Sequence, residues 1–405
     1  MTNDVATEVL FKDATESMVK NFGRSTLYEF FSDWVIYRNL EPMDKRLPGL
    51  KVAGYKMGLA GDRIPRKLEK DYAKAALWFS EEAQRLRGVK TPIQEIILIG
   101  DTLLNDGTAY QNMRSLSGLP GACFIGCEKI TQEPSVEIDD KDQVYSANRW
   151  SALGAWAQWA LDSGLRMNVN TLVVVDIDKT ALGAKGRNDQ VIDKARLEGI
   201  YRTMDAVLGE DFDHNSFERA YAEFNRTPYH LLTEDNQDYI AYICLVVNTG
   251  LIQFDEVVQE VKKKSLDNFD QFLRWVGSRM MLKHNGGEGF RQVHEAVVAS
   301  VRSGDPTPFK RFRREEFIST VAHMGNMADD SSVADLLKNE ITLTEEVCAL
   351  SEWLKGRDCL QLCLSDKPDE ASRPNAHSSP NLAPLHKTAT HRVGVDIRKL
   401  LNNLK

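Results

Sequence analysis

Residues 171–180 read Thr-Leu-Val-Val-Val-Asp-Ile-Asp-Lys-Thr, and this stretch decides the fold prediction. Its first half is short, rich in β-branched residues and free of alternation, which is typical of a strand buried inside a parallel sheet. Its second half places Asp176 and Asp178 at the carboxyl end of that strand, where open α/β sheets bind their ligands. Two carboxylates this close repel each other. The pattern therefore favours a bound divalent cation, or a division of work between a nucleophile and a proton donor.

Two further apolar runs end in polar residues and predict neighbouring strands. The run at 96–99 is followed by Gly-Asp-Thr-Leu-Leu-Asn-Asp at 100–106, and the run at 360–364 by Ser-Asp-Lys-Pro at 365–368. Because parallel strands share one carboxyl edge, we expect these polar groups to converge with Asp176. Carboxylate and hydroxyl oxygens of this kind suit Mg²⁺, which takes one or two protein carboxylates and leaves places for water and phosphate.

The periodicity along the chain divides it into sheet-forming and helical parts. The chain has 405 residues, which is more than one compact core usually holds. The strand runs fall within 51–182 and 346–405, whereas residues 183–345 show helical periodicity and residues 1–50 predict a helical leader. Residues 130–146 are acidic and predict a loop. We therefore expect an α/β fold, with a Rossmann-like parallel sheet flanked by helices and interrupted by a large all-helical insertion.

The amino-acid composition indicates which kinds of partner the protein binds and in which compartment it works. Lys and Arg number 51 against 59 for Asp and Glu, a net charge of −8 that argues against a general nucleic-acid binder but permits a local cationic pocket. No apolar stretch approaches the roughly 18 to 20 residues of a membrane span, and the acidic N-terminus lacks a secretory pattern. The six cysteines form no CxxC pair, which favours a reducing cytoplasm. A zinc site from the pairs Cys123/Cys127 and Cys359/Cys363 is disfavoured, since no histidines stand at ligand spacing.

Three of these segments resemble motifs of the haloacid dehalogenase (HAD) superfamily. Residues 176–180 resemble its first motif, DxDxT, and residues 100–106 resemble its fourth motif, GDxxxxD. Residues 364–368 are similar to its second motif, a strand that ends in Ser or Thr. In the family the fourth motif follows the first, whereas here it precedes it. The resemblance therefore implies a circular permutation, which protein folds tolerate when the joined ends lie close together at the surface.

The resemblance implies a role for each matching residue. Asp176 would be the nucleophile and a metal ligand, and Asp178 the general acid and base, with its backbone carbonyl on the metal. Ser365 would hydrogen-bond the transferring phosphoryl group. Asp101 and Asp106 would bind Mg²⁺, the implied cofactor, and Thr180 would support the Asp176 loop.

The family's third motif is a lysine that neutralises the nucleophile and the phosphoryl group. In the family it lies some thirty residues before GDxxxxD at the start of a helix, and Lys67 and Lys70 fit that placement. Lys387 competes if the segment around it folds over the site. We prefer Lys67.

The helical block at 183–345 matches the position of the family's C1 cap, a domain that closes over the substrate and excludes water. The segment 183–189 would be its first hinge. Gly183 and Gly186 suit a flexible crossing, and Lys185 and Arg187 would approach an anionic substrate.

Together these features predict a Mg²⁺-dependent phosphatase that hydrolyses a small phosphorylated metabolite through an aspartyl-phosphate on Asp176. The second aspartate, Asp178, suits phosphatases and phosphomutases, which need an acid for the leaving group. A phosphomutase is one alternative, and a HAD-fold binding or regulatory protein without turnover is another. The sequence leaves the substrate and the oligomeric state open.

Overall fold

The computed structural model describes residues 18–59, 63–282, 287–377 and 379–404. The chain forms two compact units, which we call the sheet unit and the helical unit. The helical unit consists of Arg196–Ser319 with Asn375–Ser379. The sheet unit takes its described residues from the stretch up to Ala195, from Thr320–Pro374 and from Pro380 onward.

A seven-stranded sheet forms the centre of the sheet unit, in the order β2-β9-β7-β3-β4-β6-β5. Every neighbouring pair from β2 to β6 is parallel, and only the edge strand β5 runs antiparallel to its partner β6. The predicted α/β fold with a mostly parallel sheet is confirmed, and it is compatible with a Rossmann-like arrangement. The strands are β2 (Val35–Ile36), β9 (Leu360–Leu364), β7 (Thr171–Val175), β3 (Glu95–Gly100), β4 (Gly121–Gly126), β6 (Val144–Ala147) and β5 (Val136–Asp139).

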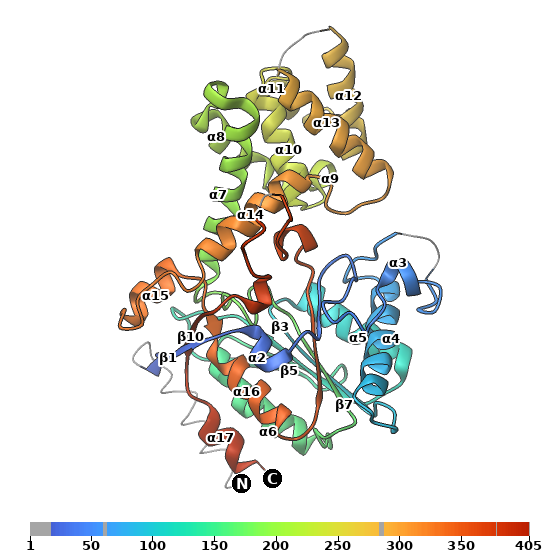
Figure 1. Cartoon of the computed structure of the whole chain (residues 1–405), viewed down its shortest axis with the longest axis vertical. Helices are drawn as coiled ribbons and strands as arrows, with labels where there is room; N and C mark the ends of the chain where they lie inside the picture. The colour runs from blue at the N-terminus through green and yellow to red at the C-terminus, as the bar shows by residue number, and fades with distance from the viewer. Residues whose placement is uncertain (1–17, 60–62, 283–286, 378, 405) are drawn as a thin grey trace. The chain divides into compact units, whose positions relative to one another are not determined.

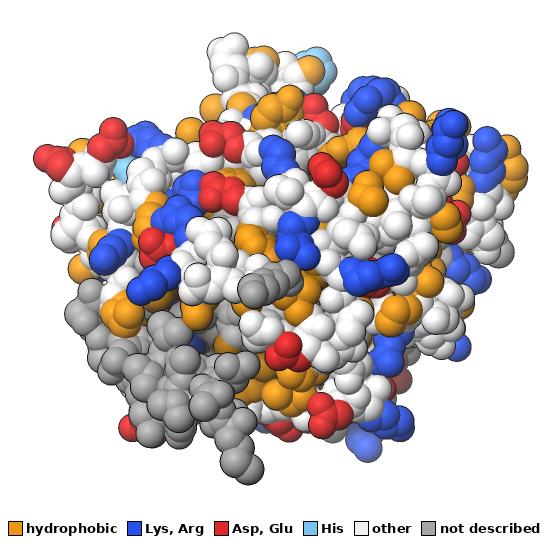
Figure 2. Space-filling model, turned by 90° about the horizontal axis from the view of Figure 1, so that it is seen from below, with side chains coloured by type: hydrophobic (Ala, Val, Ile, Leu, Met, Phe, Trp, Pro, Cys, Tyr) orange, Lys and Arg blue, Asp and Glu red, His pale blue; other side chains and the backbone are white. Residues whose placement is uncertain are grey.

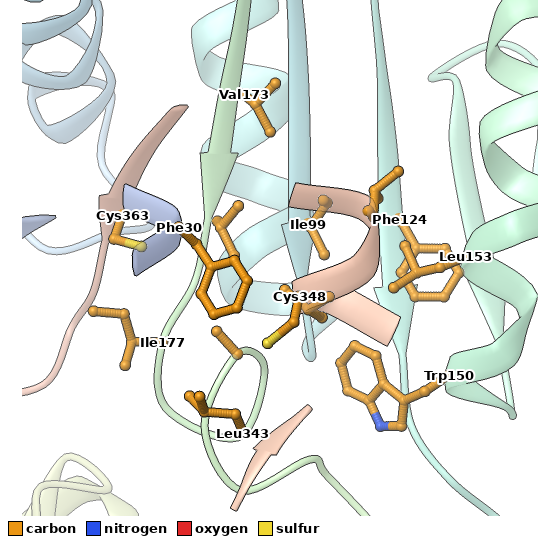
Figure 3. Close-up of a cluster of buried hydrophobic side chains, with 14 of the residues drawn as sticks. Phe30, Ile99, Phe124, Trp150, Leu153, Val173, Ile177, Leu343, Cys348 and Cys363 are labelled. Atoms are coloured by element: carbon orange, nitrogen blue, oxygen red, sulfur yellow. The ribbon is translucent and has the colours of Figure 1, made fainter. Parts of the chain in front are cut away.

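Both faces of this sheet are covered, because its central strands are mostly apolar and are buried at every position. Ile97 and Ile99 belong to one buried cluster, shown in part in Figure 3, and Ile96 and Leu98 belong to the other. The first cluster is closed by α2 (Leu27–Phe31), α6 (Leu153–Asp162), α16 (Glu345–Lys355) and α17 (Arg398–Asn403). The second is closed by α3 (Leu50–Ala53), α4 (Lys70–Leu86) and α5 (Thr108–Ser117) (Figure 1).

The structure differs from the sequence expectation at two places in this unit. Residues 18–50 of the predicted helical leader hold the strands β1 (Lys20–Ser25) and β2 as well as α2, and they are part of the sheet unit; residues 1–17 lie outside the described residues. The predicted loop at 130–146 holds β5 and β6. β5 was not predicted because it is an exposed edge strand with acidic side chains, and such charges commonly protect the edge of a sheet.

A second, three-stranded sheet holds the segment that follows Asp176. β1 pairs antiparallel with β10 (Thr390–Gly394), and β10 pairs parallel with β8 (Leu343–Thr344). β8 lies in the region expected to be helical throughout. Its Thr344 donates its backbone N–H to the carbonyl of Ala181 at 3.0 Å and its hydroxyl to the carbonyl of Thr180 at 2.5 Å. This small sheet therefore fixes the loop that carries the two aspartates.

The helical unit has its own apolar core around α10, whose sequence is apolar on nearly all sides and whose residues are almost all buried. Its limits differ from the predicted insertion at 183–345, because Val191, Ile192 and Ile341 pack into the core of the sheet unit. The helices α7 (Asp189–Leu208) and α14 (Lys310–Ala322) cross the limits of the unit. Its other helices are α8 (His214–Phe224), α9 (His230–Thr233), α10 (Gln237–Asn248), α11 (Phe254–Lys262), α12 (Phe269–Leu282) and α13 (Gly287–Arg302).

Among the helices in the described part of the chain, none is long and apolar enough to cross a membrane. Acidic and basic side chains are interspersed over the face shown in Figure 2.

Candidate active site

The three motif-bearing strands are direct neighbours, and their ends are level. Val175 of β7 pairs with Ile99 of β3 on one side and with Cys363 of β9 on the other. Asp176 continues the ladder, since its N–H donates to the carbonyl of Ile99 at 2.9 Å. With strands about 4.8 Å apart, the residues after β3 and β9 flank Asp176 closely. The order of the motifs along the chain does not matter for this convergence.

The loop after β7 is closed by its own backbone. The N–H groups of Ala181 and Leu182 donate to the carbonyls of Asp176 and Ile177, at 3.2 and 2.9 Å. Lys179 has a φ of 63°, the left-handed conformation that such a tight reversal requires. The loop thus presents Asp176 buried at 6% exposure, and Asp178 more open with its side chain 25% exposed.

Lys67 joins two of the motifs through its ammonium group. Its Nζ lies 2.7 Å from Asp176 Oδ1 and 2.5 Å from Asp106 Oδ1, and all three side chains are buried. Lys67 stands just before α4, the position expected for the third-motif lysine. Of the other two lysines considered, Lys70 is exposed, and Lys387 pairs with Asp33 at 2.8 Å.

Asp106 organises the turn after β3. Its Oδ2 accepts the N–H groups of Asp101 and Thr102, at 3.0 and 2.9 Å, and the Thr102 hydroxyl at 3.1 Å. Gly100 makes room for this carboxyl group, because a Cβ there would lie 2.3 Å from Asp106 Cγ. The turn therefore holds Asp106 Oδ2, and Asp106 Oδ1 lies against the Lys67 ammonium.

The buried charges of this cluster shift one another's pKa. Burial works against the charge of Lys67, but Asp106 and Asp176 outweigh it and hold the pKa of Lys67 well above its usual value. For Asp106, the effect of burial is outweighed by Lys67, so its pKa is lowered. Burial raises the pKa of Asp176 well above its usual value, and the charges of Asp106 and Asp101 add to this in spite of Lys67. Asp176 thus lacks sufficient positive charge nearby to stay ionised easily.

Asp101 stands at the margin of the cluster, with its own lysine. Lys185 Nζ lies 2.9 Å from Asp101 Oδ2. Burial and the charge of Asp106 raise the pKa of Asp101 to about 6, although Lys185 counteracts them.

On the other side of Asp176, the turn after β9 supplies Ser365 and Lys367. Ser365 is buried; its N–H donates to the carbonyl of Ile36 at 3.0 Å, and its Oγ accepts the N–H of Lys367 at 3.2 Å. Lys367 Nζ lies 3.4 Å from Asp178 Oδ1. The turn therefore puts a hydroxyl and a second buried ammonium beside the aspartate loop.

The structure also changes the picture drawn from the sequence. Arg187 does not face a substrate, because its guanidinium is buried between Glu128 and Glu346, 2.8 Å from each. One group near the site, Lys367, was not predicted from the sequence. Lys367 stands directly after Asp366 in the segment that resembles the second motif, so its sequence position was a signal.

The residues present fit a divalent cation. Three neighbouring carboxylates, those of Asp176, Asp106 and Asp101, lie against the ammonium groups of Lys67 and Lys185, and burial together with the charges of Asp106 and Asp101 raises the pKa of Asp176. Within the described ranges, no three His, Cys, Asp or Glu side chains form a metal-binding group by themselves. Mg²⁺ needs only one or two protein carboxylates. Because Asp106 Oδ2 already accepts three hydrogen bonds from the turn, Asp176 and the more exposed Asp101 are the side chains that would hold the ion.

We compared the chain with known proteins. No protein-family model, no curated protein and no solved structure matches it.

Proposed function

We propose that this protein is a Mg²⁺-dependent phosphatase of the HAD type with a permuted motif order, acting on a small phosphomonoester. The observation that carries the proposal is the contact of Lys67 with both Asp176 and Asp106. These residues come from three separate segments, each singled out by its likeness to a family motif. They meet at the carboxyl edge of a parallel sheet, where such folds bind ligands.

The first half of the reaction would transfer the phosphoryl group to the protein. A carboxylate oxygen of Asp176 forms a bond to phosphorus while the bond from phosphorus to the leaving oxygen breaks. Asp178 donates its proton to that oxygen, so the product leaves as a neutral alcohol. The more open position of Asp178 suits contact with the leaving group, and the buried position of Asp176 suits a nucleophile shielded from water.

The second half would return Asp176 to its starting state. Asp178 takes a proton from a water molecule, whose oxygen attacks phosphorus as the bond to the Asp176 oxygen breaks, and inorganic phosphate is released. Lys67 and the Ser365 hydroxyl would stabilise the charge on the phosphoryl oxygens in both halves. A bound Mg²⁺ would supply additional positive charge to the nucleophile and the phosphoryl group.

Substitution of Asp176 tests this proposal directly. Asp176→Asn should abolish hydrolysis of p-nitrophenyl phosphate and of a panel of metabolite phosphates while the protein stays folded. Asp140→Asn, an exposed aspartate in the turn after β5, is the matched control and should keep full activity. EDTA should stop the wild-type reaction, and mass spectrometry of acid-quenched protein should find a phosphoryl group on Asp176. Normal turnover by Asp176→Asn would refute the mechanism.

The same panel separates the alternatives. A phosphomutase would need a bisphosphate activator and would interconvert monoesters without releasing phosphate. A binding protein would hydrolyse nothing in the panel.

A further inference from the structure

Lys185 is a cation aimed at Asp101 from the margin of the candidate active site. Its ammonium lies 2.9 Å from Asp101 Oδ2 and also donates to the Asp101 backbone carbonyl at 3.1 Å. The Lys185 side chain is 29% exposed, whereas that of Lys67 is 4% exposed. Of these two lysines, Lys185 is therefore the one that solvent and solutes can reach.

The backbone of Lys185 is fixed, so its side chain is the adjustable part. Its N–H donates to the carbonyl of Lys179 at 2.9 Å, and its carbonyl accepts the N–H of Glu128 at 2.8 Å and Nε1–H of Trp150 at 3.2 Å. The next residue, Gly186, has a φ of 78°, and a Cβ there would lie 2.0 Å from the carbonyl oxygen of Glu128. The main chain therefore stays in place when the side chain moves or is replaced.

The two lysines differ in how easily they can be displaced. Lys67 contacts two buried carboxylates, whereas Lys185 contacts the side chain of one aspartate that is 11% exposed. The Lys185–Asp101 pair is therefore more accessible to solvent than the contacts of Lys67 and more easily exchanged for another cation. A divalent cation on Asp101 competes with the Lys185 ammonium for the same carboxylate, and an ammonium group has no lone pair with which to bind that cation. The displaced ammonium would still be tethered beside the site, where positive charge attracts an anion.

We propose that Lys185 is a displaceable counter-ion. It neutralises Asp101 until a divalent cation binds there, and it then provides positive charge for the phosphate group of the substrate. This inference rests on the proposed function, because it takes Asp101 as a metal ligand. It makes Lys185 a residue with opposite effects on two ligands, weakening the binding of the metal and strengthening that of phosphate.

Replacement of the charge tests both effects on the full chain. Calorimetric titration with Mn²⁺, as a stand-in for Mg²⁺, should show that Lys185→Gln binds the metal about five times more tightly than wild type. Titration with inorganic phosphate at saturating Mn²⁺ should show about fivefold weaker binding by the same variant. Lys194→Gln is the matched control: this lysine is exposed on α7, outside the site, and both affinities should stay unchanged.

The outcome for Asp101→Asn separates the inference from the proposed function. If this variant binds Mn²⁺ less tightly than wild type while Lys185→Gln binds it no more tightly, the inference fails and the metal site stands. Unchanged phosphate binding by Lys185→Gln also overturns the inference. If Asp101→Asn and wild type bind Mn²⁺ alike, the metal role of Asp101 fails and the inference fails with it.

Discussion

Replacing Lys67 with methionine would remove the ammonium group that contacts both Asp106 and Asp176, while keeping most of the apolar stem. In the wild type, Lys67 lowers the pKa of Asp106. The pair therefore stabilises the folded protein at every pH above 3.8, the ordinary aspartate pKa, and this stabilisation is lost as the pH falls below 3.8. In the variant, burial instead favours the protonated carboxyl group. The folded variant then holds a proton that the unfolded chain releases, so its stability decreases as the pH rises.

The size of the loss follows from two independent arguments. Removing one partner of a buried ion pair costs about 3–5 kcal/mol. Protonating an aspartate of ordinary pKa at pH 7 costs about 4 kcal/mol, at 1.36 kcal/mol per pH unit. In the variant, Asp106 keeps its hydrogen bonds from Asp101 and Thr102, which stabilise the carboxylate. The expected loss of stability therefore lies toward the lower end of these values. We expect a loss of about 3–4 kcal/mol at pH 7, shrinking by about 1.4 kcal/mol for each unit of lower pH.

Urea unfolding followed by tryptophan fluorescence measures this loss, because every tryptophan except Trp275 lies in the sheet unit. The matched control is Lys70→Met, an exposed lysine three residues away, which should change the free energy of unfolding by less than about 0.5 kcal/mol. A Lys67→Met variant as stable as this control at pH 7, or with the same loss at every pH, would show that the three charges do not depend on one another.

Two further predictions concern a close contact and a buried histidine. Gly100→Ala should push the Asp106 carboxyl group aside, lower the free energy of unfolding by about 1–3 kcal/mol and reduce phosphatase activity, as urea unfolding and phosphate release would show. In the helical unit, burial lowers the pKa of His294, whose Nδ1 lies 2.5 Å from the Tyr242 hydroxyl. Below about pH 6.5 the unfolded chain binds a proton on His294 more readily than the folded unit does. The free energy of unfolding should therefore decrease as the pH is lowered. Trp275 fluorescence during thermal unfolding should show this slope in wild type and a reduced slope in His294→Gln.

The sequence predicted the strands that consist of a continuous, mostly apolar run. It did not predict the short strands that form only by pairing with strands distant in the chain. β3, β4, β7 and β9 are buried at each position and consist mostly of apolar residues because both faces are covered, so they stand out in the sequence. β2 and β8 have only two residues each, and their pairing depends on strands far away in the chain. No local pattern reveals pairings of that kind.

The candidate site shows the same division. The aspartates could be named because they follow predicted strands, but the choice among Lys67, Lys70 and Lys387 required the fold, since each is a lysine in a polar segment. The pairing of Lys367 with Asp178 likewise follows from strand order and not from spacing along the chain. The chemical roles of these residues stay predictions until the substitutions above are made.

The strand order has a consequence for synthesis on the ribosome. β7 lies between β3 and β9, yet about 185 residues separate Val175 from Leu360. Because the ribosome adds about 5–20 residues per second, the edge of β7 that later pairs with β9 stays unpaired for roughly 10–40 s. An apolar strand with unpaired backbone groups invites pairing with other chains during that interval. A nascent chain halted between these strands should therefore be a preferred client for chaperones.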